Sequence, residues 1–385
     1  GNTVIFIFVL VLKILARCHD RMIRNKKYHL IRTFLKVIVF KRSFYGKSSN
    51  IMRAVRIHSL GGPSVLQIDY NLPIPKPAKN EILVKVKAAG VNPVDTYMRQ
   101  GINGYNPSVP IILGKEASGE VQCVGAEVKE FKKGDRVICA LSHGAYSEFI
   151  TCDKDSVIPL PDRFNFSQGA ALYISYFTAY RALVTKCKIK KGELVLVHGA
   201  SGSVGTAGVQ IAKAHGLTVI GTAGTAEGLE IVKKNGADYV IDHREENHLQ
   251  KILQEIGQKG FDVILENRAC LNLNDDMKFL REKGRIGVVG SRGTLEVNPR
   301  HLISHEGTVI GVRLNAISED EFKEYSKVLL KGVEDGWVKP IIAEEYSMED
   351  IPQAHVDVIR ENGAKGKLIL LLNQKQISID QQAKD

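Results

Sequence analysis

The chain has 385 residues, of which 44% are hydrophobic and 25% charged, a composition that excludes disordered, collagenous and coiled-coil proteins. Residues 1–50 hold eleven Lys or Arg and one acid, whereas the other 335 residues hold 42 bases and 41 acids, so nearly all of the net charge of +11 comes from the N-terminal segment. The rest of the chain therefore gives little support for a basic, nucleic-acid-binding surface.

Residues 1–50 are interpreted as an N-terminal extension. The apolar run 4–12 is shorter than the roughly 17 to 25 residues that span a bilayer, so we expect no stable membrane span. From Met22 the segment has bases, no acids and apolar residues at helical spacing, which is typical of a mitochondrial presequence. The alternative is translated sequence upstream of the mature protein, because the chain opens with Gly1. We expect a cytoplasmic protein, or a mitochondrial one if the presequence is genuine.

A mostly antiparallel β domain is predicted for residues 51–170. Gly- and Pro-rich turns separate its strand candidates, which lie at 54–57, 65–68, 82–88, 118–124, 136–139 and 147–151. Residues 170–183 then have the pattern of a helix that leads into a different architecture.

Strand and helix candidates alternate from residue 193, which predicts a doubly wound parallel sheet within residues 171–307. The expected strands are 194–198, 218–222, 239–242, 262–266 and 285–289, and the expected helices are 203–215, 226–235, 246–257 and 273–281. We expect residues 308–374 to return to the first domain, with helices at 319–331 and 348–361 and a strand at 366–372. A polar tail, 375–385, follows.

A glycine-rich turn, residues 199–205, directly follows the strand candidate 194–198. Such a turn brings the backbone close to a pyrophosphate and presents the free N–H groups of a helix N-terminus to it. We expect Gly202 to permit this approach and Gly205 to permit tight packing of helix against strand. The spacing is a variant, because Ala200 stands where the first glycine of G-x-G-x-x-G is usual. An ordinary strand-to-helix turn is the alternative, and the alternating pattern disfavours it.

The end of the second strand candidate indicates which dinucleotide is bound. An NAD site usually has an acid there, about 20 residues after the glycine turn, but the first acid in this chain is Glu227. The absence of that carboxylate favours NADPH. His243 and Arg244, after the third strand, are the nearest candidate donors to its 2′-phosphate, unless they are two solvated loop residues.

Nine short motifs follow one another within residues 52–372: Arg53-Ala-Val, Gly90-Val-Asn-Pro-Val-Asp-Thr-Tyr, Gly114-Lys-Glu-Ala-Ser-Gly, Lys133-Gly-Asp-Arg-Val, Tyr176-Phe-Thr-Ala-Tyr, His198-Gly-Ala-Ser-Gly, Gly221-Thr-Ala-Gly-Thr, Asp242-His-Arg-Glu and Val288-Val-Gly-Ser-Arg-Gly. Together they resemble the zeta-crystallin-like quinone oxidoreductases of the zinc-free medium-chain dehydrogenase/reductases. The resemblance implies an α/β protein with a GroES-like catalytic domain, a Rossmann domain and NADPH in the cleft between them.

The resemblance also implies roles for individual residues. Tyr97 and Asn92 are candidate hydrogen-bond donors to a quinone carbonyl, and Thr178 either orients the nicotinamide or packs within its helix. Ser203 departs from the family, which commonly has glycine there. The implied cofactor-binding residues are Tyr97, Ser201, Gly202, Ser203, Val204, Gly205, Gly224, His243, Asn272, Val289, Gly290, Ser291, Arg292, Val312, Arg313 and Leu314.

The positions that bind zinc in metal-dependent relatives differ in this chain. Those relatives use a Cys, a Gly-His-Glu motif and a four-Cys lobe, whereas the corresponding places here read Asn92 and Gly114-Lys115-Glu116, without a Cys cluster. These are not the usual zinc ligands, so we predict no metal.

The expected activity is NADPH-dependent reduction of quinones, one electron at a time and without zinc, to semiquinones. One alternative is an NADPH-dependent enoyl or enone reductase. Another, from a different class, is an AU-rich RNA-binding or structural crystallin-type protein, although the near-neutral charge of residues 51–385 allows only weak RNA binding. The resemblance further implies a homotetramer.

Overall fold

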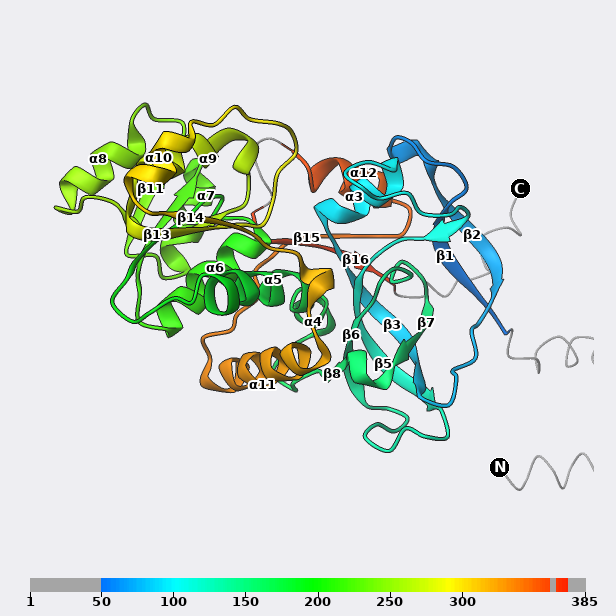
Figure 1. Ribbon diagram of the computed structural model, residues 1–385. Coiled ribbons are helices and arrows are strands. Elements are labelled where there is room, and N and C mark those ends of the chain that lie inside the picture. Colours follow the sequence, from blue (N-terminus) through cyan, green and yellow to red (C-terminus); the bar gives the residue numbers. More distant parts are fainter. Residues whose placement is uncertain (1–49, 361–364, 373–385) are drawn as a thin grey trace, which may run out of the picture. The chain divides into compact units, whose positions relative to one another are not determined.

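Three sheets organise the described part of the chain, which covers residues 50–360 and 365–372 of a computed structural model (Figure 1). The described residues from Ile51 onward belong to a single unit of contacts. The proposed presequence from Met22 and the polar tail 375–385 lie outside the described residues. Among the helices that are described, none is both long enough and apolar enough to cross a membrane.

The first sheet has six strands, and every neighbouring pair is parallel. In spatial order the strands are β11 (Tyr239–Asp242), β10 (Thr218–Ala223), β9 (Leu194–Val197), β12 (Phe261–Glu266), β13 (Leu280–Val288) and β14 (Thr308–Gly311). The chain runs from β9 outward to β11 on one side and then from β12 outward to β14 on the other. This order confirms the predicted doubly wound sheet and places its switch point between β9 and β12.

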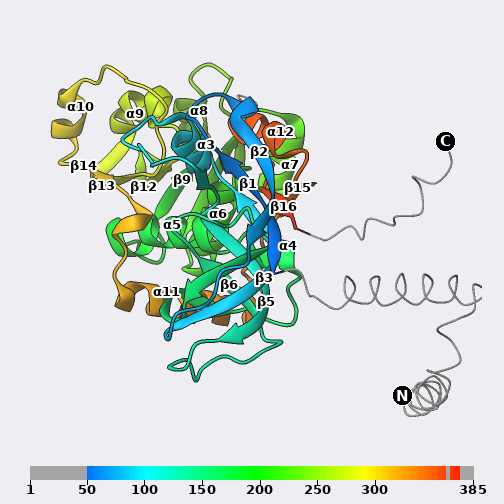
Figure 2. The same ribbon diagram turned by 90° about the vertical axis from the view of Figure 1, so that its right-hand side faces the viewer.

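Both faces of this sheet are buried, which explains its continuously apolar strands. On β9, Val195 and Val197 share a core with residues of α6 (Ser203–Ala214) and α11 (Glu319–Asp335). Leu194 and Leu196 share the opposite core with residues of α8 (His248–Glu255) and α9 (Ala269–Lys278). Figure 2 shows helices on the two sides of the sheet. Full burial of each such side chain contributes about 1.5 to 3 kcal/mol.

The strand β14 corrects an expected domain boundary. It pairs with β13, with Val309 opposite Ile286, so residues 308–311 complete the parallel sheet. The core residues of α11 also pack against this sheet. The expected return to the first domain at residue 308 is therefore wrong, because the four-residue strand and the long helix after it belong to the Rossmann-like half.

The second sheet is mostly antiparallel, as predicted, and is built from both ends of the described chain. Its strands are β15 (Ile342–Tyr346), β16 (Lys367–Leu371), β3 (Glu81–Val91), β5 (Glu116–Val124), β6 (Arg136–Ala140) and β8 (Val157–Pro159), with β7 (Phe149–Asp153) paired to β3. Only its β15–β16 pair is parallel. A small antiparallel sheet joins β2 (Leu66–Pro73), β1 (Ile51–Ile57) and β4 (Ile111–Ile112).

The single helix expected at residues 170–183 is replaced by a series of short helical turns. They are α4 (Phe166–Gly169), a π-helical turn (Tyr173–Phe177), α5 (Thr178–Tyr180) and a second π-helical turn (Arg181–Lys186). In the first π-helical turn, the Ile174 N–H donates to Glu116 Oε2 at 2.8 Å. This side-chain acceptor diverts the amide from the regular helical ladder, and π-helical turns of this kind often occur at functional sites.

The remaining helices connect the strands. They are α3 (Pro93–Gln100), α7 (Ala226–Lys234), α10 (Pro299–Ser304) and α12 (Ile351–Asp357), with 3₁₀ turns at Pro63–Val65, Lys154–Ser156 and Leu314–Ala316. The helix expected at 273–281 starts earlier, at Ala269, because the Glu266 carboxylate accepts the Arg268 amide hydrogen at its entrance.

Candidate active site

The glycine loop connects β9 to α6. Gly202 is the N-cap of α6, with φ −76° and ψ 170°, and no side chain caps this helix. The first amide groups of a helix have no acceptor within the helix. The N–H groups of Ser203, Val204 and Gly205 are therefore available to an anion, as predicted from the motif.

Close packing behind this loop depends on Gly205. A Cβ at Gly205 would lie 2.2 Å from the Gly199 carbonyl oxygen and 2.6 Å from the Ala200 Cα, so any larger residue would push α6 away from the loop. Gly199 itself has φ +59°, in the left-handed region that favours glycine. Backbone amides without an acceptor in the helix, on a loop this compact, fit the pyrophosphate of a dinucleotide.

The other predicted cofactor-binding residues lie at or beyond the carboxyl ends of the parallel strands. Gly224 follows β10; His243 follows β11; Asn272 lies in α9 after β12; Val289, Gly290, Ser291 and Arg292 follow β13; and Val312, Arg313 and Leu314 follow β14. Carboxyl ends of parallel strands meet at one edge of a sheet, where such folds bind ligands. The structure thus gathers these residues at the edge that carries the glycine loop.

Short contacts show how closely these strand ends approach one another. A Cβ at Gly224 would lie 2.5 Å from His243 Nε2, and the Val312 N–H donates to the Val288 carbonyl at 2.9 Å. Arg292 Nη1 donates to the carbonyl of Ile359, after α12, at 2.8 Å. The edge of the parallel sheet is therefore in contact with the half of the protein that carries α12.

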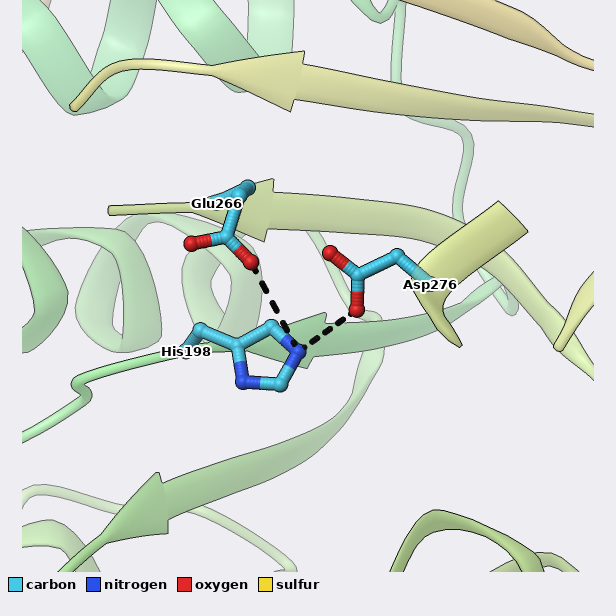
Figure 3. Close-up of side chains that lie close together, drawn as sticks. All are labelled: His198, Glu266 and Asp276. Atoms are coloured by element: carbon cyan, nitrogen blue, oxygen red, sulfur yellow. Dashed lines mark hydrogen bonds and ion pairs between the residues drawn. The ribbon is translucent and has the colours of Figure 1, made fainter. Parts of the chain in front are cut away.

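A buried cluster of three titratable side chains lies beneath the glycine loop (Figure 3). His198 Nε2 lies 2.8 Å from Asp276 Oδ1 and 3.8 Å from Glu266 Oε2, and all three side chains are at most 3% exposed. Asn272 donates to Glu266 Oε2 at 3.1 Å, so its amide is engaged with this cluster. The His198 carbonyl in turn accepts from Asn267 Nδ2 at 2.8 Å. The cluster thus ties the start of the loop to β12 and α9.

Burial favours the protonated form of both acids in this cluster. Burial raises the pKa of Glu266 to about 8 and that of Asp276 to about 7. A hydrogen bond between the two carboxyl groups adds to the rise in the pKa of Glu266 and opposes the rise for Asp276, so Glu266 loses its proton at the higher pH. Burial also lowers the pKa of His198. Burial therefore favours the uncharged form of all three groups, as expected for groups removed from water.

These three side chains are also the one group of His, Cys, Asp or Glu in the described ranges that is close enough to share a metal ion. Their contacts are those of a hydrogen-bonded cluster, because His198 Nε2 lies 2.8 Å from Asp276 Oδ1 and Glu266 is hydrogen-bonded to Asn272. We therefore assign the cluster a supporting role beneath the loop.

A second buried cluster, formed by Asn92, Glu116 and Lys367, lies in the mostly antiparallel half. The Lys367 ammonium donates to Glu116 Oε1, and also to Asn92 Oδ1 at 2.6 Å. The Lys367 and Glu116 side chains are 2% and 0% exposed. The cluster joins β16, β5 and the N-cap of α3, the helix that carries Tyr97.

The bonds of Asn92 correct its predicted role. Asn92 Nδ2 donates to Glu116 Oε1 at 3.0 Å and to the Gly90 carbonyl at 3.3 Å. Both amide hydrogens are therefore used inside the protein, and the expectation that Asn92 donates to a quinone carbonyl is wrong. The residue instead positions α3.

Tyr97 differs from Asn92 in its hydrogen bonding, and a second tyrosine, Tyr105, interacts with it electrostatically. Tyr97 is partly buried on α3, and its hydroxyl makes no hydrogen bond to any other residue in the described ranges. Burial raises the pKa of Tyr105, and its phenol also interacts electrostatically with Asp95, Arg313 and Tyr97. Sequence reasoning missed Tyr105, although it is the next tyrosine along the chain. Thr178 is buried at the start of α5.

Comparison with known proteins identifies close relatives. The family model of the alcohol dehydrogenase GroES-like domain matches residues 78–162, and that of the zinc-binding dehydrogenases matches residues 203–331. Quinone oxidoreductases of Mus musculus and Homo sapiens are 47% and 46% identical, and each match covers 84% of this chain and 98% of the relative. The structure of Escherichia coli quinone oxidoreductase complexed with NADPH is 34% identical, with a TM-score of 0.76, and covers 83% of this chain and 99% of that one.

Breaking the buried pair of Lys367 and Glu116 should be costly. We expect Lys367→Met to lower the free energy of unfolding by about 3 to 5 kcal/mol, because it leaves a buried carboxylate without its counter-ion. Adding Glu116→Gln should restore part of the loss in denaturant unfolding. The control is Lys87→Met, at a half-exposed pair with Glu120 on the same sheet, which should lose less than about 1 kcal/mol. Strictly additive losses in the double variant would contradict this account.

The pKa of Asp276 predicts a pH dependence of stability. In the unfolded chain its carboxyl ionises near pH 3.8, whereas in the folded protein it does so near pH 7. The folded state therefore holds more protons between these values, and the carboxyl destabilises it progressively as the pH rises from about 4 to about 7. We expect Asp276→Asn to gain stability relative to the wild type across this window in denaturant unfolding.

The control for this comparison is Asp275→Asn, the same change at the exposed neighbouring aspartate of α9. If the free energy of unfolding depends on pH with the same slope in both variants, Asp276 does not have a raised pKa in the folded protein.

Proposed function

This chain belongs to the quinone oxidoreductase family, and from that premise we propose that it is an enzyme that reduces quinones with NADPH. The observation that carries the proposal is the sheet edge itself. Free amides of the glycine loop and a strand end that lacks the usual NAD carboxylate lie at this edge. A bound NADPH supplies two electrons and a hydrogen nucleus from its nicotinamide.

The residues around the loop bind and orient this cofactor. The N–H groups of Ser203, Val204 and Gly205 donate to the pyrophosphate, where the positive end of α6 adds to the attraction. β10 ends at Ala223, and Gly224 follows it without an acidic side chain. The carboxylate that an NAD site usually has at the strand end is therefore missing here, which supports NADPH over NADH.

The quinone binds beside Tyr97 and Tyr105. The unpaired hydroxyl of Tyr97 donates a hydrogen bond to a quinone carbonyl, and the aromatic rings flank the flat substrate. A quinone is already electron-poor and needs little polarisation, so correct placement of the two reactants supplies most of the catalysis. Thr178, at the start of α5, is proposed to help orient the nicotinamide.

We also propose that the reaction does not use zinc. The ammonium of Lys367 is hydrogen-bonded to Asn92 and Glu116, two residues at positions that correspond to zinc-site motifs in metal-dependent relatives. Lys115 Nζ donates to the Ser142 carbonyl at 2.7 Å. A fixed protein cation satisfies the buried Glu116 carboxylate, which supports a zinc-independent enzyme.

The finer details of the reaction are proposed from the family resemblance. One NADPH is expected to reduce two quinones to two semiquinone anions, which yields NADP⁺ and one proton. The homotetramer, weak RNA binding and cytoplasmic or mitochondrial location stay predictions.

The activity is tested on residues 51–385 by NADPH oxidation at 340 nm, in buffer with EDTA. The acceptors are an ortho-quinone, a para-quinone and a 2-enoyl thioester, with NADH in parallel. We expect turnover of a quinone with NADPH, unaffected by the chelator, and a semiquinone signal in electron paramagnetic resonance. Turnover of the thioester alone would instead identify an enoyl reductase, and loss of activity in EDTA would contradict zinc independence.

The cofactor site is tested by Gly202→Asp. Asp is a favoured N-cap residue, so the variant should fold, but its carboxylate would repel the pyrophosphate. We expect loss of NADPH binding by calorimetry. Gly62→Asp is the matched control, because Gly62 is an exposed helix N-cap with a similar extended backbone, φ −69° and ψ 179°. Unchanged NADPH affinity in Gly202→Asp would remove this site assignment.

A further inference from the structure

The two residues that the sequence offers for the 2′-phosphate do not supply a free cation. Arg244 Nε and Nη2 donate to Asp242 at 3.0 Å and 2.6 Å, a two-point ion pair that holds the pKa of Asp242 well below its usual range and binds the guanidinium more firmly than a single contact would. Burial of its ring against Gly224 lowers the pKa of His243, so this ring is uncharged at pH 7. A doubly charged phosphate at the end of β10 needs a cation from elsewhere.

Such a cation comes from the far end of the described chain. The Lys365 ammonium, just before β16, pairs with the carboxylate of Glu227 in the first turn of α7. These residues lie 138 positions apart. Glu227 is also the first acid after β10. It is therefore the acid that follows most closely the strand end where an NAD site usually has its carboxylate. The pair therefore places one positive and one negative group at the strand end that selects the dinucleotide.

The first turn of α7 directly borders the glycine loop. A Cβ at Gly228 would lie 3.3 Å from Ser201 Oγ and 3.0 Å from Thr225 Oγ1. The turn that holds Glu227 is therefore in contact with the loop expected to bind the pyrophosphate. The adenosine ribose extends from that pyrophosphate toward the end of β10, which brings its 2′ position to this turn.

The pair is open enough to exchange partners. The Lys365 and Glu227 side chains are 37% and 64% exposed. An exposed ion pair contributes little to stability, so Lys365 can leave Glu227 for a phosphate at small cost. A phosphate carries more charge than a carboxylate and is the stronger partner.

We propose that Lys365 is the cation that binds the 2′-phosphate of NADPH, and that Glu227 holds Lys365 in place when no cofactor is bound. This assignment rests on the proposed NADPH function. Lys365 favours the phosphate, whereas Glu227 repels it and would accept a hydrogen bond from the free 2′-hydroxyl of NADH. The two side chains thus act in opposite directions on cofactor preference.

Binding rather than turnover tests the assignment. Calorimetry measures the dissociation constants of NADPH, NADH, 2′,5′-ADP and 5′-AMP with the full chain. We expect Lys365→Met to weaken NADPH and 2′,5′-ADP by about tenfold, as for the loss of one charge-assisted hydrogen bond, and to leave 5′-AMP unchanged. Glu227→Gln should tighten NADPH and weaken NADH.

The matched control is Lys331→Met, which removes another exposed, ion-paired lysine, on α11. Suppose that the wild type prefers NADPH and that Lys365→Met keeps this preference, as Lys331→Met is expected to do. Lys365 then only bridges α7 and β16, and this assignment is overturned, while the proposed function stands. If the wild type binds NADPH no better than NADH, the proposed NADPH function fails, and this assignment fails with it.

Discussion

The mostly antiparallel half of the protein depends on the interactions of one buried carboxylate, that of Glu116. It accepts hydrogen bonds from Lys367, Asn92 and the Ile174 amide, and thereby joins β16, the N-cap of α3 and the first π-helical turn to β5. A carboxylate removed from water is stable only when such partners surround it. The neighbouring strand must also stay close, since a Cβ at Gly90 would lie 2.3 Å from Glu116 Oε1. One charge thus fixes the helix that carries Tyr97 and the segment that leads to Thr178.

The parallel sheet provides the complementary constraint. Its strands end at one edge, and the His198 cluster anchors the glycine loop at that edge from below. Contacts such as that of Arg292 with the Ile359 carbonyl join this edge to the mostly antiparallel half, which carries α12. The cofactor site and the tyrosines are therefore held by two separate buried polar clusters, one in each half. This arrangement suits a reaction that depends on positioning two flat molecules, because neither cluster needs to move during it.

Local sequence patterns predicted much of this architecture, but they did not predict which polar side chains pair over long distances in the sequence. Apolar alternation predicted the parallel sheet, and the spacing of glycines predicted the loop and the packing role of Gly205. Asn92 was assigned to the substrate because nothing near it in sequence indicates Lys367, 275 residues away. The partnership of His198 with Asp276, 78 residues later, was invisible for the same reason. Which buried polar side chains pair with each other depends on tertiary packing, and the local periodicity of the sequence does not indicate it.

The central claim is that NADPH and a quinone meet between the edge of the parallel sheet and α3. A crystal structure of residues 51–385 with NADP⁺ and a quinone tests it most directly. The account predicts the pyrophosphate on the amides of Ser203–Gly205 and a quinone carbonyl within hydrogen-bond distance of the Tyr97 hydroxyl. A dinucleotide bound away from the glycine loop, or a quinone remote from Tyr97, would contradict it.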